Sequence, residues 1–375
     1  MQHYLPTHYL VRQRGSSTAN SLLPILVAFV ALSIGFFLYQ QGQDKTPEVP
    51  EFQRIILLPA ARELSDFSLQ THLDGTFSKQ DLRGKWSLIF FGFTHCPDIC
   101  PTTLLALRNV RNQLEASGQW PDMNVLMVSV DPERDTVSRL SQYVPFFHPE
   151  FLGITGDEPV ITEFAKQLGI LIRKNTPDEN GYYDVDHGAS LILINPQGQY
   201  AGVVTAPHQE SAMLSDFDKL GQLIGRSSTT SQPEATQTES SDVSNTKPQL
   251  STDTNIAVSN SWIRHAPPSS SAYSAYLELR NDTDRAIEIT GVKSPDFGMA
   301  MIHDTIIEDG LASMEHLDSI TLEANQTLTL APMATHIMLM RPQRSINLGD
   351  QIPISLTTKS GEYDFLATVK ESAAN

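Results

Sequence analysis

The apolar positions along the chain follow three successive patterns. Residues 22–39 form a nearly unbroken apolar run. Through 63–225, short apolar runs alternate with segments in which apolar residues recur at helical spacing. From residue 255 onward, short β-rich segments recur with turn residues between them. These patterns predict an apolar helix, a layered α/β domain and an all-β domain.

The apolar run predicts a membrane-spanning helix at 22–39. Eighteen helical residues rise about 27 Å, which is enough to cross a bilayer core. Arg12 and Arg14 precede the run, so the positive-inside rule assigns 1–21 to the cytoplasm and the later domains to the periplasm. A cleaved signal peptide is the alternative, but no small-x-small site follows the run. We therefore expect a single-pass anchor in a bacterial inner membrane, followed by a polar stalk over 40–62.

In the domain over 63–225, apolar runs predict strands and amphipathic segments predict helices. The expected strands are 67–69, 74–77, 86–93, 125–130, 190–194 and 198–204. The expected helices are 102–116, 136–144 and 160–168. Thr136 and Asp157 stand near the N-termini of the last two helices, where short polar side chains are favoured. The alternation is typical of a layered α/β domain.

The composition changes twice after this domain. Residues 226–254 are rich in Ser, Thr, Gln, Glu, Asp and Pro and predict a flexible linker that spans about 30 Å. Residues 255–375 predict a β-sandwich or barrel, because they contain many short strands and no long helix. The expected strands are 261–263, 272–279, 287–289, 302–307, 319–322, 327–330, 336–340, 352–356 and 365–369.

The charge and the cysteines narrow the class of function. A net charge of −17 argues against a nucleic-acid binder, which needs clustered Lys and Arg. Cys96 and Cys100 are the only cysteines, and a disulfide closing so short a loop would add little stability. They lie between an expected strand and the N-terminus of an expected helix, which stabilises thiolate. Thiolate is a redox nucleophile and also a soft ligand for Cu(I), so both roles stay open; two inert cysteines are the least favoured interpretation.

The C-x3-C spacing lets both sulfur atoms face one metal ion, and His187 is the candidate for a third ligand. This domain resembles the Sco/SenC family, thioredoxin-fold copper proteins that mature cytochrome c oxidase. Four motifs carry the resemblance, in the family's order: CPDICP at 96–101, SVDPERDT at 129–136, VDH at 185–187 and NPQG at 195–198. The resemblance implies that Cys96, Cys100 and His187 bind one copper ion.

Two details qualify this resemblance. No proline lies between Gly181 and Ser190, where a thioredoxin-like reductase carries its cis-proline loop, and His187 stands there instead. The family usually has Ser or Thr after this histidine, whereas this chain has Gly188. We also expect Asp186 to orient a ligand, as carboxylates near metal-bound histidines do. The same role is considered, with less support, for two further aspartates: Asp98 and Asp131.

The second domain lacks cysteine but concentrates methionine and histidine. Methionine on a strand is usually core filler, as we expect for Met299, Met301 and Met340. The remaining set matches the pattern H-x10-M-x21-H-x-M of the PCuAC-type periplasmic copper chaperones: His303, Met314, His336 and Met338. The resemblance covers about residues 255–370 and implies a cupredoxin-like sandwich in which these four side chains bind copper. Imidazole and thioether ligands suit Cu(I).

The sequence therefore predicts a membrane-anchored periplasmic copper metallochaperone rather than an enzyme. Each domain would bind one copper ion, as Cu(I) or Cu(II), and the client would be the dinuclear copper site of a cytochrome c oxidase subunit. Other periplasmic copper or thiol-redox proteins are further candidate partners; nucleic acid is not. One alternative is a thiol–disulfide reductase with Cys96 and Cys100 as its redox pair and an attached copper domain. The other is a copper storage or resistance protein.

Overall fold

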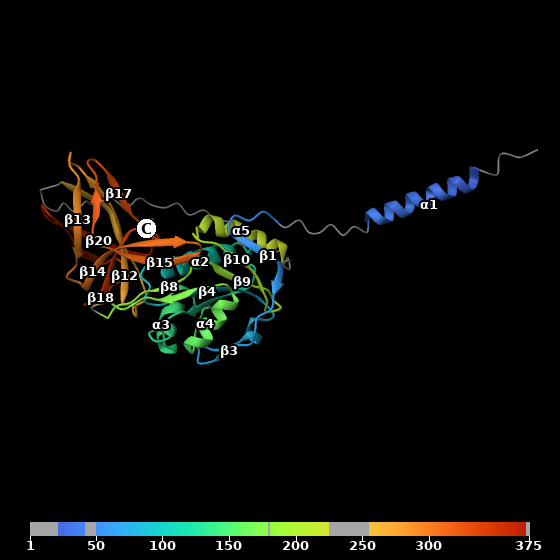
Figure 1. Ribbon diagram of the computed structural model, residues 1–375, viewed down its shortest axis with the longest axis horizontal. Helices are drawn as coiled ribbons and strands as arrows, with labels where there is room; N and C mark the ends of the chain where they lie inside the picture. The colour runs from blue at the N-terminus through green and yellow to red at the C-terminus, as the bar shows by residue number, and fades with distance from the viewer. Residues whose placement is uncertain (1–21, 42–49, 179–180, 225–254, 373–375) are drawn as a thin grey trace, which may run out of the picture. The chain divides into compact units, whose positions relative to one another are not determined.

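A computed structural model describes residues 22–41, 50–178, 181–224 and 255–372 (Figure 1). Residues 1–50 form one unit, whose helix α1 spans Leu22–Gln41, and residues 51–375 form another. Among the described residues, no helix combines the length and the hydropathy that crossing a membrane requires, so the predicted transmembrane anchor at 22–39 is not supported. The predicted cytoplasmic segment, 1–21, and the predicted linker, 226–254, lie outside the described residues.

The first domain is built on an eight-stranded sheet with the order β1-β10-β9-β4-β5-β6-β2-β3. Its strands are β1 (Ile55–Arg62), β2 (Ser68–Thr71), β3 (Thr76–Ser78), β4 (Trp86–Gly92), β5 (Met123–Ser129), β6 (Leu152–Thr155), β9 (Leu191–Ile194) and β10 (Tyr200–Val204). The central strands β4 and β5 run parallel and are almost entirely buried. Such continuous apolar strands are typical of a sheet that is covered on both faces.

Four α-helices cover this sheet, α2 and α5 on one face and α3 and α4 on the other (Figure 1). They are α2 (Ile99–Ala116), α3 (Val137–Phe147), α4 (Glu158–Gln167) and α5 (Glu210–Leu223), and a short 3-10 helix, η2, spans Lys79–Leu82. The predicted α/β architecture is confirmed. Thr136 caps α3 by accepting the backbone N–H of Arg139 at 3.2 Å. Helix α5 was not predicted, although Met213, Phe217 and Leu220 are buried at helical spacing.

The predicted stalk ends earlier than the sequence suggested. Residues 55–62 form β1, which pairs antiparallel with β10 at the edge of the sheet. The buried carboxylate of Asp216 on α5 accepts backbone N–H groups from Gln53, Arg54 and Ile55 at 2.9, 2.6 and 3.0 Å. The assignment of these residues to a stalk was therefore wrong, since a side chain far away in sequence holds them in the domain.

The second domain is all-β throughout its described residues, as predicted. Its strands are β11 (Ile256–Arg264), β12 (Ala272–Asn281), β13 (Ile287–Lys293), β14 (Phe297–Glu308), β15 (Leu311–Leu317), β16 (Ile320–Leu322), β17 (Thr327–Leu330), β18 (His336–Pro342), β19 (Gln351–Thr358) and β20 (Gly361–Lys370). Sequence reasoning missed β15, although Asp309-Gly310 is a strong hairpin signal between β14 and β15.

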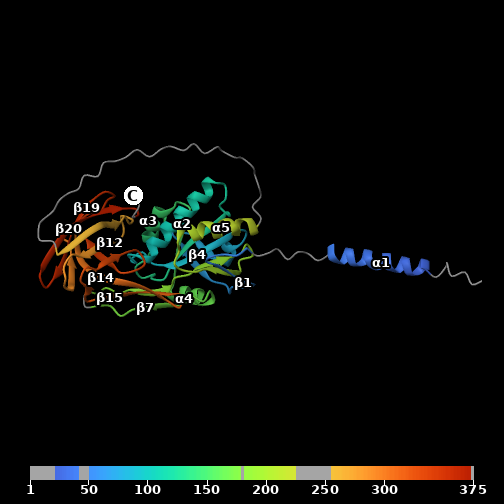
Figure 2. The same cartoon turned by 90° about the horizontal axis from the view of Figure 1, so that it is seen from above.

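Two strands of the first domain, β7 (Ile172–Lys174) and β8 (Val185–Gly188), extend the sheet of the second. Strand β8 pairs antiparallel with β15 (Figure 1), and β7 lies along the same edge (Figure 2). In this ladder Ala312 lies opposite His187. The backbone N–H of Ala189 also donates to the carbonyl of Gly310 at 2.8 Å. The strand that carries His187 is therefore bonded to the strand that carries Met314.

Candidate metal centre

The two cysteines lie where β4 ends and α2 begins. Both are buried and neither forms a disulfide. Cys100 stands in the first turn of α2, and its backbone N–H points at the Sγ atom of Cys96, 3.5 Å away. Gly92 leaves the space for this turn, because a Cβ atom there would stand 2.9 Å from the Cys100 Sγ. The helix N-terminus thus faces the first sulfur atom, as expected for a stabilised thiolate.

His187 completes the first set. Its Nε2 atom lies 3.6 Å from the Cys100 Sγ, and its Nδ1 lies 3.2 Å from the carbonyl oxygen of Gly188. Because a carbonyl only accepts hydrogen bonds, Nδ1 carries a proton, and Nε2 faces the sulfur atoms. The rings of Phe90 and Phe93 stand edge-on to the imidazole at 6.0 Å. The structure thus brings Cys96, Cys100 and His187 into one buried place.

The two thiols differ in acidity. Burial alone would raise the pKa of Cys96, but hydrogen bonds with Cys100 and His187 outweigh burial and lower it to about 5. Burial and the neighbouring Cys96 raise the pKa of Cys100 well above its ordinary value. At neutral pH the pair therefore consists of one thiolate and one thiol. A thiolate beside an imidazole can act as a soft metal ligand or as a nucleophile.

The SVDPERDT motif anchors the cysteine loop. The carboxylate of Asp135 accepts hydrogen bonds from the Thr94 backbone at 3.0 Å, the Thr94 hydroxyl at 2.6 Å and the Ser129 hydroxyl at 2.7 Å. Arg134 lies 3.7 Å above the Tyr183 ring and donates to the Tyr183 carbonyl at 3.1 Å. The motif thus fixes both the residues before Cys96 and the segment before His187.

The three aspartates considered as orienting groups have other partners. Asp186 accepts hydrogen bonds from Arg173 at 2.8 Å and Asn175 at 3.0 Å. Asp131 is paired with Arg134 and accepts the hydroxyl of Tyr183 at 2.9 Å. Asp98 is bonded to the second domain. The Nδ1–H group of His187 donates its hydrogen bond instead to the main-chain carbonyl of Gly188.

In the second domain, His303 on β14 lies directly opposite His336 on β18, and their ring centroids are 6.3 Å apart. The Nδ1 of His336 donates to the Ala334 carbonyl at 2.8 Å, which leaves Nε2 as a buried lone pair without a partner. Both ring nitrogens of His303 are also buried and unpartnered. Burial lowers the pKa of His303 to about 3, so its imidazole is neutral. Buried polar atoms without partners are rare, and a bound ion would satisfy them.

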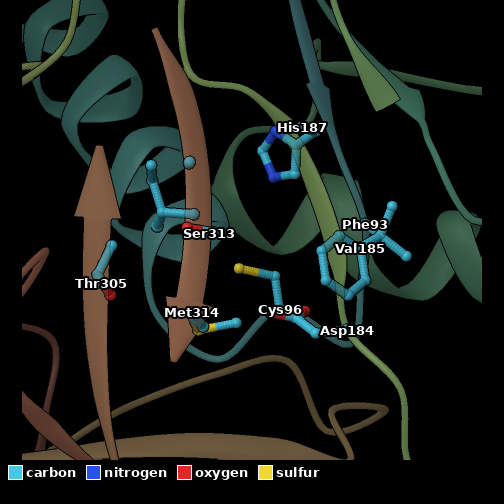
Figure 3. Close-up of a pocket in the computed structure, with 10 residues that line it drawn as sticks. Phe93, Cys96, Asp184, Val185, His187, Thr305, Ser313 and Met314 are labelled. Atoms are coloured by element: carbon cyan, nitrogen blue, oxygen red, sulfur yellow. The ribbon is translucent and has the colours of Figure 1, made fainter. Parts of the chain in front are cut away.

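The two predicted methionine ligands, Met338 and Met314, lie in different places. Met338 is fully buried, shares the strand face of His336, and its Sδ lies 3.9 Å from the hydroxyl of Tyr182 in the first domain. Around it packs a small cluster of Met299, Met301, Ala272 and Met340. Met314, on β15, instead lines a pocket with Cys96 and His187 (Figure 3). The structure thus gathers three members of the second set, whereas Met314 faces the first set.

Neither set is already closed around an ion. In the described part of the chain, no three His, Cys, Asp or Glu side chains stand at metal-binding geometry. The 3.6 Å between Cys100 Sγ and His187 Nε2 is nevertheless a separation that one ion bridges with bonds of about 2.0–2.3 Å. Two of the four predicted ligands of the second set, Met314 and Met338, are methionines and so do not belong to these four residue types.

Two family models match the chain. Residues 58–222 match the model described as "SCO1/SenC". Residues 256–369 match the model described as "Putative lipoprotein LpqE-like". The boundary between the two matches coincides with the change from the α/β domain to the all-β domain.

Several curated proteins are similar to the first domain. The bovine "Protein SCO2 homolog, mitochondrial" is 42% identical over 144 residues, which are 38% of this chain and 54% of that protein. The zebrafish protein of the same name is 34% identical over 212 residues, which are 52% of this chain and 75% of that protein. A "Putative copper-binding protein" of Stutzerimonas stutzeri is 37% identical over 153 residues, 41% of this chain and 74% of that protein. The chain thus spans about half of the bovine protein and three quarters of the other two.

Solved structures are similar to each domain. Copper-bound ScoI of Arabidopsis thaliana is 32% identical, with 42% of this chain and 98% of that chain covered and a TM-score of 0.39. The copper-bound PCuAC domain from PmoF2 is 24% identical, with 32% and 94% covered and a TM-score of 0.27. At more than 30% identity, the chain covers three quarters of the zebrafish and Stutzerimonas proteins, and it therefore belongs to the Sco/SenC family, with a second, LpqE-like domain of the PCuAC type.

Proposed function

We propose that this protein is a copper metallochaperone that carries one copper ion in each domain. The observation that carries the proposal is the buried convergence of the Cys96 thiolate, the Cys100 thiol and the Nε2 atom of His187. Thiolate and imidazole ligands suit both Cu(I) and Zn(II), so the ligand types alone leave these two metals open. Membership of the Sco/SenC family and the name of the Stutzerimonas relative support copper.

The second domain supports a second ion. His303 and His336 present buried ring nitrogens without hydrogen-bond partners, and Met338 adds a thioether on the same face. The thioether of Met338 does not titrate, and thioether with imidazole suits Cu(I). The PCuAC pattern implies Met314 as the fourth ligand, although in this structure Met314 faces the first set. The ion is cargo in both domains, since a chaperone must also release it.

We further propose, from family membership, that the client is the dinuclear copper site of a cytochrome c oxidase subunit and that delivery takes place in the periplasm. Mixing the copper-loaded chain with a purified, metal-free oxidase copper domain tests the client. The expected result is that copper appears on the acceptor as the chain loses it, measured as the copper content of each protein after the two are separated. A chain that keeps its copper in the presence of a competent acceptor would exclude this client.

The copper sites are tested by stoichiometry. The wild-type chain is expected to hold two Cu(I) ions, and the double variant Cys96→Ser, Cys100→Ser one. His187→Ala is expected to weaken the first site about 10–100-fold or more. His148→Ala is the matched control, because that histidine contacts Phe151 and lies outside both sets. Copper K-edge absorption identifies the ligands of the remaining ion, and an unchanged two-ion stoichiometry in the cysteine variant would refute the first site.

A thiol–disulfide reductase is the second candidate, and the acidity of the two thiols favours it. A lowered pKa at Cys96 and a raised pKa at Cys100 are the properties of an attacking and a resolving thiol. His187→Ala separates the two functions. Loss of copper with retained thiol exchange supports copper binding through His187, whereas unchanged copper affinity favours the reductase.

A further inference from the structure

The face of the second domain that carries its candidate ligands is closed over the cysteine loop. Asp98, between the two cysteines, is fully buried at the N-cap of α2, and its side chain caps no backbone N–H of that helix; within α2 it accepts only a long hydrogen bond from the Thr102 hydroxyl at 3.3 Å. The carboxylate instead accepts three hydrogen bonds from the second domain. The donors are the Tyr276 hydroxyl, the Thr305 hydroxyl and the Met333 backbone N–H, each at 2.8 Å.

The two hydroxyl donors, Tyr276 and Thr305, lie on the same strand faces as the second set of ligands. Thr305 is two residues beyond His303 on β14, so both side chains project from one face. Ser274 lies directly opposite Met338, and its hydroxyl donates to the carbonyl of Pro97 at 2.8 Å. Tyr276, two residues along β12, shares that face. The ligand-bearing face and the docking face are therefore one surface.

The carboxylate of Asp98 also reaches the second set itself. Its Oδ2 atom lies 3.8 Å from Nδ1 of His336, on the opposite side of the imidazole from the free Nε2. The Nδ1 atom donates to the Ala334 carbonyl at 2.8 Å, so Asp98 is a close charged neighbour of this ring and not its hydrogen-bond partner. The latch carboxylate therefore lies beside a candidate ligand of the second set.

Strand pairing brings Met314 to the first set. Ala312 lies opposite His187 in the β8–β15 ladder, and Met314 shares the face of Ala312. Met314, Cys96 and His187 line one pocket, whose free volume of about 10 Å³ has room for a guest the size of one ion or one water molecule (Figure 3). A predicted ligand of the second set therefore stands beside the first.

We propose that Asp98 latches the second domain onto the cysteine loop, and that in this closed state Cys96 and Met314 bind one copper ion jointly, as the intermediate through which copper passes between the domains. The copper part rests on the proposed function. For passage out of the first set, the bond from Cys100 Sγ to Cu(I) breaks and a bond from Met314 Sδ forms. Cu(I) keeps its oxidation state, no electron moves, and the released thiolate takes up one proton from water. The reverse passage runs through the same steps backwards.

The latch is tested without metal, on the full chain. Tyr276→Phe combined with Thr305→Val removes two donors and keeps the side-chain volumes. Hydrogen–deuterium exchange of the amides in β8 and β15 is expected to accelerate at least tenfold, while exchange in β4 and β19 stays unchanged. Tyr363→Phe with Thr290→Val is the matched control, because those hydroxyls are exposed. Unchanged exchange in β8 and β15 would refute the latch, as would equal acceleration by the control pair.

The shared ion is tested by selenomethionine labelling. His336→Ala with Met338→Leu disables the second set, and the full chain then receives one equivalent of Cu(I). X-ray absorption at the selenium edge is expected to show a copper–selenium contact, which disappears on adding Met314→Leu and persists on adding Met299→Leu. Bound copper with no selenium contact would refute the shared ion and leave the proposed function intact. A chain that retains no copper at all would refute the proposed function itself.

Discussion

At the residue scale, burial sets the chemistry of the second ligand set. His303 is 4% exposed, and neither of its ring nitrogens has a hydrogen-bond partner. Protonation would place an unpaired charge in this site, so the folded protein binds a proton on His303 far less readily than the unfolded chain. The same desolvation keeps the lone pair free for a metal ion.

The first prediction concerns the acid stability of the metal-free protein. The pKa of His303 is about 3 in the folded protein and about 6.5 in the unfolded chain, so between these values only the unfolded chain binds the extra proton. Folding stability therefore falls as pH decreases from 6.5 toward 3, and it is unaffected by this histidine above 6.5. We expect the melting temperature to drop by more than about 5 °C between pH 7 and pH 4.5.

Scanning calorimetry at several pH values measures this drop. His303→Gln removes the titrating group and is expected to flatten the dependence below pH 6.5. His148→Gln is the control, since this histidine is partly exposed and lies outside both ligand sets. A pH profile of His303→Gln that coincides with the wild-type profile would contradict the prediction.

The second prediction explains the glycine that replaces the family's usual Ser or Thr after His187. A Cβ atom on Gly188 would stand 2.7 Å from the Ile170 Cδ1 and 3.1 Å from its Cγ2. Gly188→Ser is expected to destabilise the protein by about 1–3 kcal/mol through overpacking, and Ile170→Ala in the same chain to restore part of the loss. Urea unfolding measures both. Gly291→Ala is the control, because the nearest atom to its Cβ is 3.7 Å away; an equal loss there would rule out the explanation.

At the element scale, several boundaries depend on contacts that no local pattern contains. Strands β4 and β5 and helices α3 and α4 could be predicted from apolar runs and N-terminal signals, and their ends moved by a few residues at most. Strand β1 could not be predicted in this way. Its segment contains Pro59 and follows Pro47 and Pro50, so it resembles a stalk, and its partner strand β10 lies far along the chain. Strand β15 was missed because polar and apolar residues mix along it.

The third prediction concerns the anchor of β1. Asp216 accepts three backbone N–H groups from residues 53–55 while fully buried. Asp216→Ala leaves these donors unsatisfied and is expected to cost about 2–4 kcal/mol, because hydrogen bonds to a buried carboxylate are strong. Urea unfolding measures the cost, and limited proteolysis is expected to cut near residue 53 first. Asp284→Ala, at an exposed site, is the control. A loss within about 0.5 kcal/mol of that control would contradict the anchor role.

At the scale of the whole chain, each domain could be predicted but their association could not. The patterns identify two folds, and motifs identify both candidate ligand sets. A linker of polar residues implies domains that meet only by effective concentration. The contact instead rests on Asp98, on hydroxyls of β12 and β14, and on the β8–β15 ladder. Such polar contacts have no periodicity, so only the structure reveals them.

The last prediction is that docking controls access to the cysteines. Cys96 is 3% exposed although its pKa is lowered to about 5, so at pH 7 the thiolate is formed but covered. Iodoacetamide is therefore expected to react slowly with the wild-type chain. The double variant Tyr276→Phe, Thr305→Val removes two hydrogen bonds to the Asp98 carboxylate that exist only when the domains are docked. It therefore destabilises the closed form relative to the open form.

Hydrogen bonds to a charged group contribute about 1.5–3 kcal/mol each, so the open population is expected to rise by at least tenfold, and the alkylation rate with it. Mass spectrometry at pH 7 measures the rate at Cys96. The pair Tyr363→Phe, Thr290→Val should react like the wild type. If the wild-type chain already reacts as fast as the double variant, the cysteines are open in solution, and thiol exchange with a client needs no undocking. If only the variant reacts, any reductase activity belongs to the open form, and the closed form is reserved for passing copper between the domains.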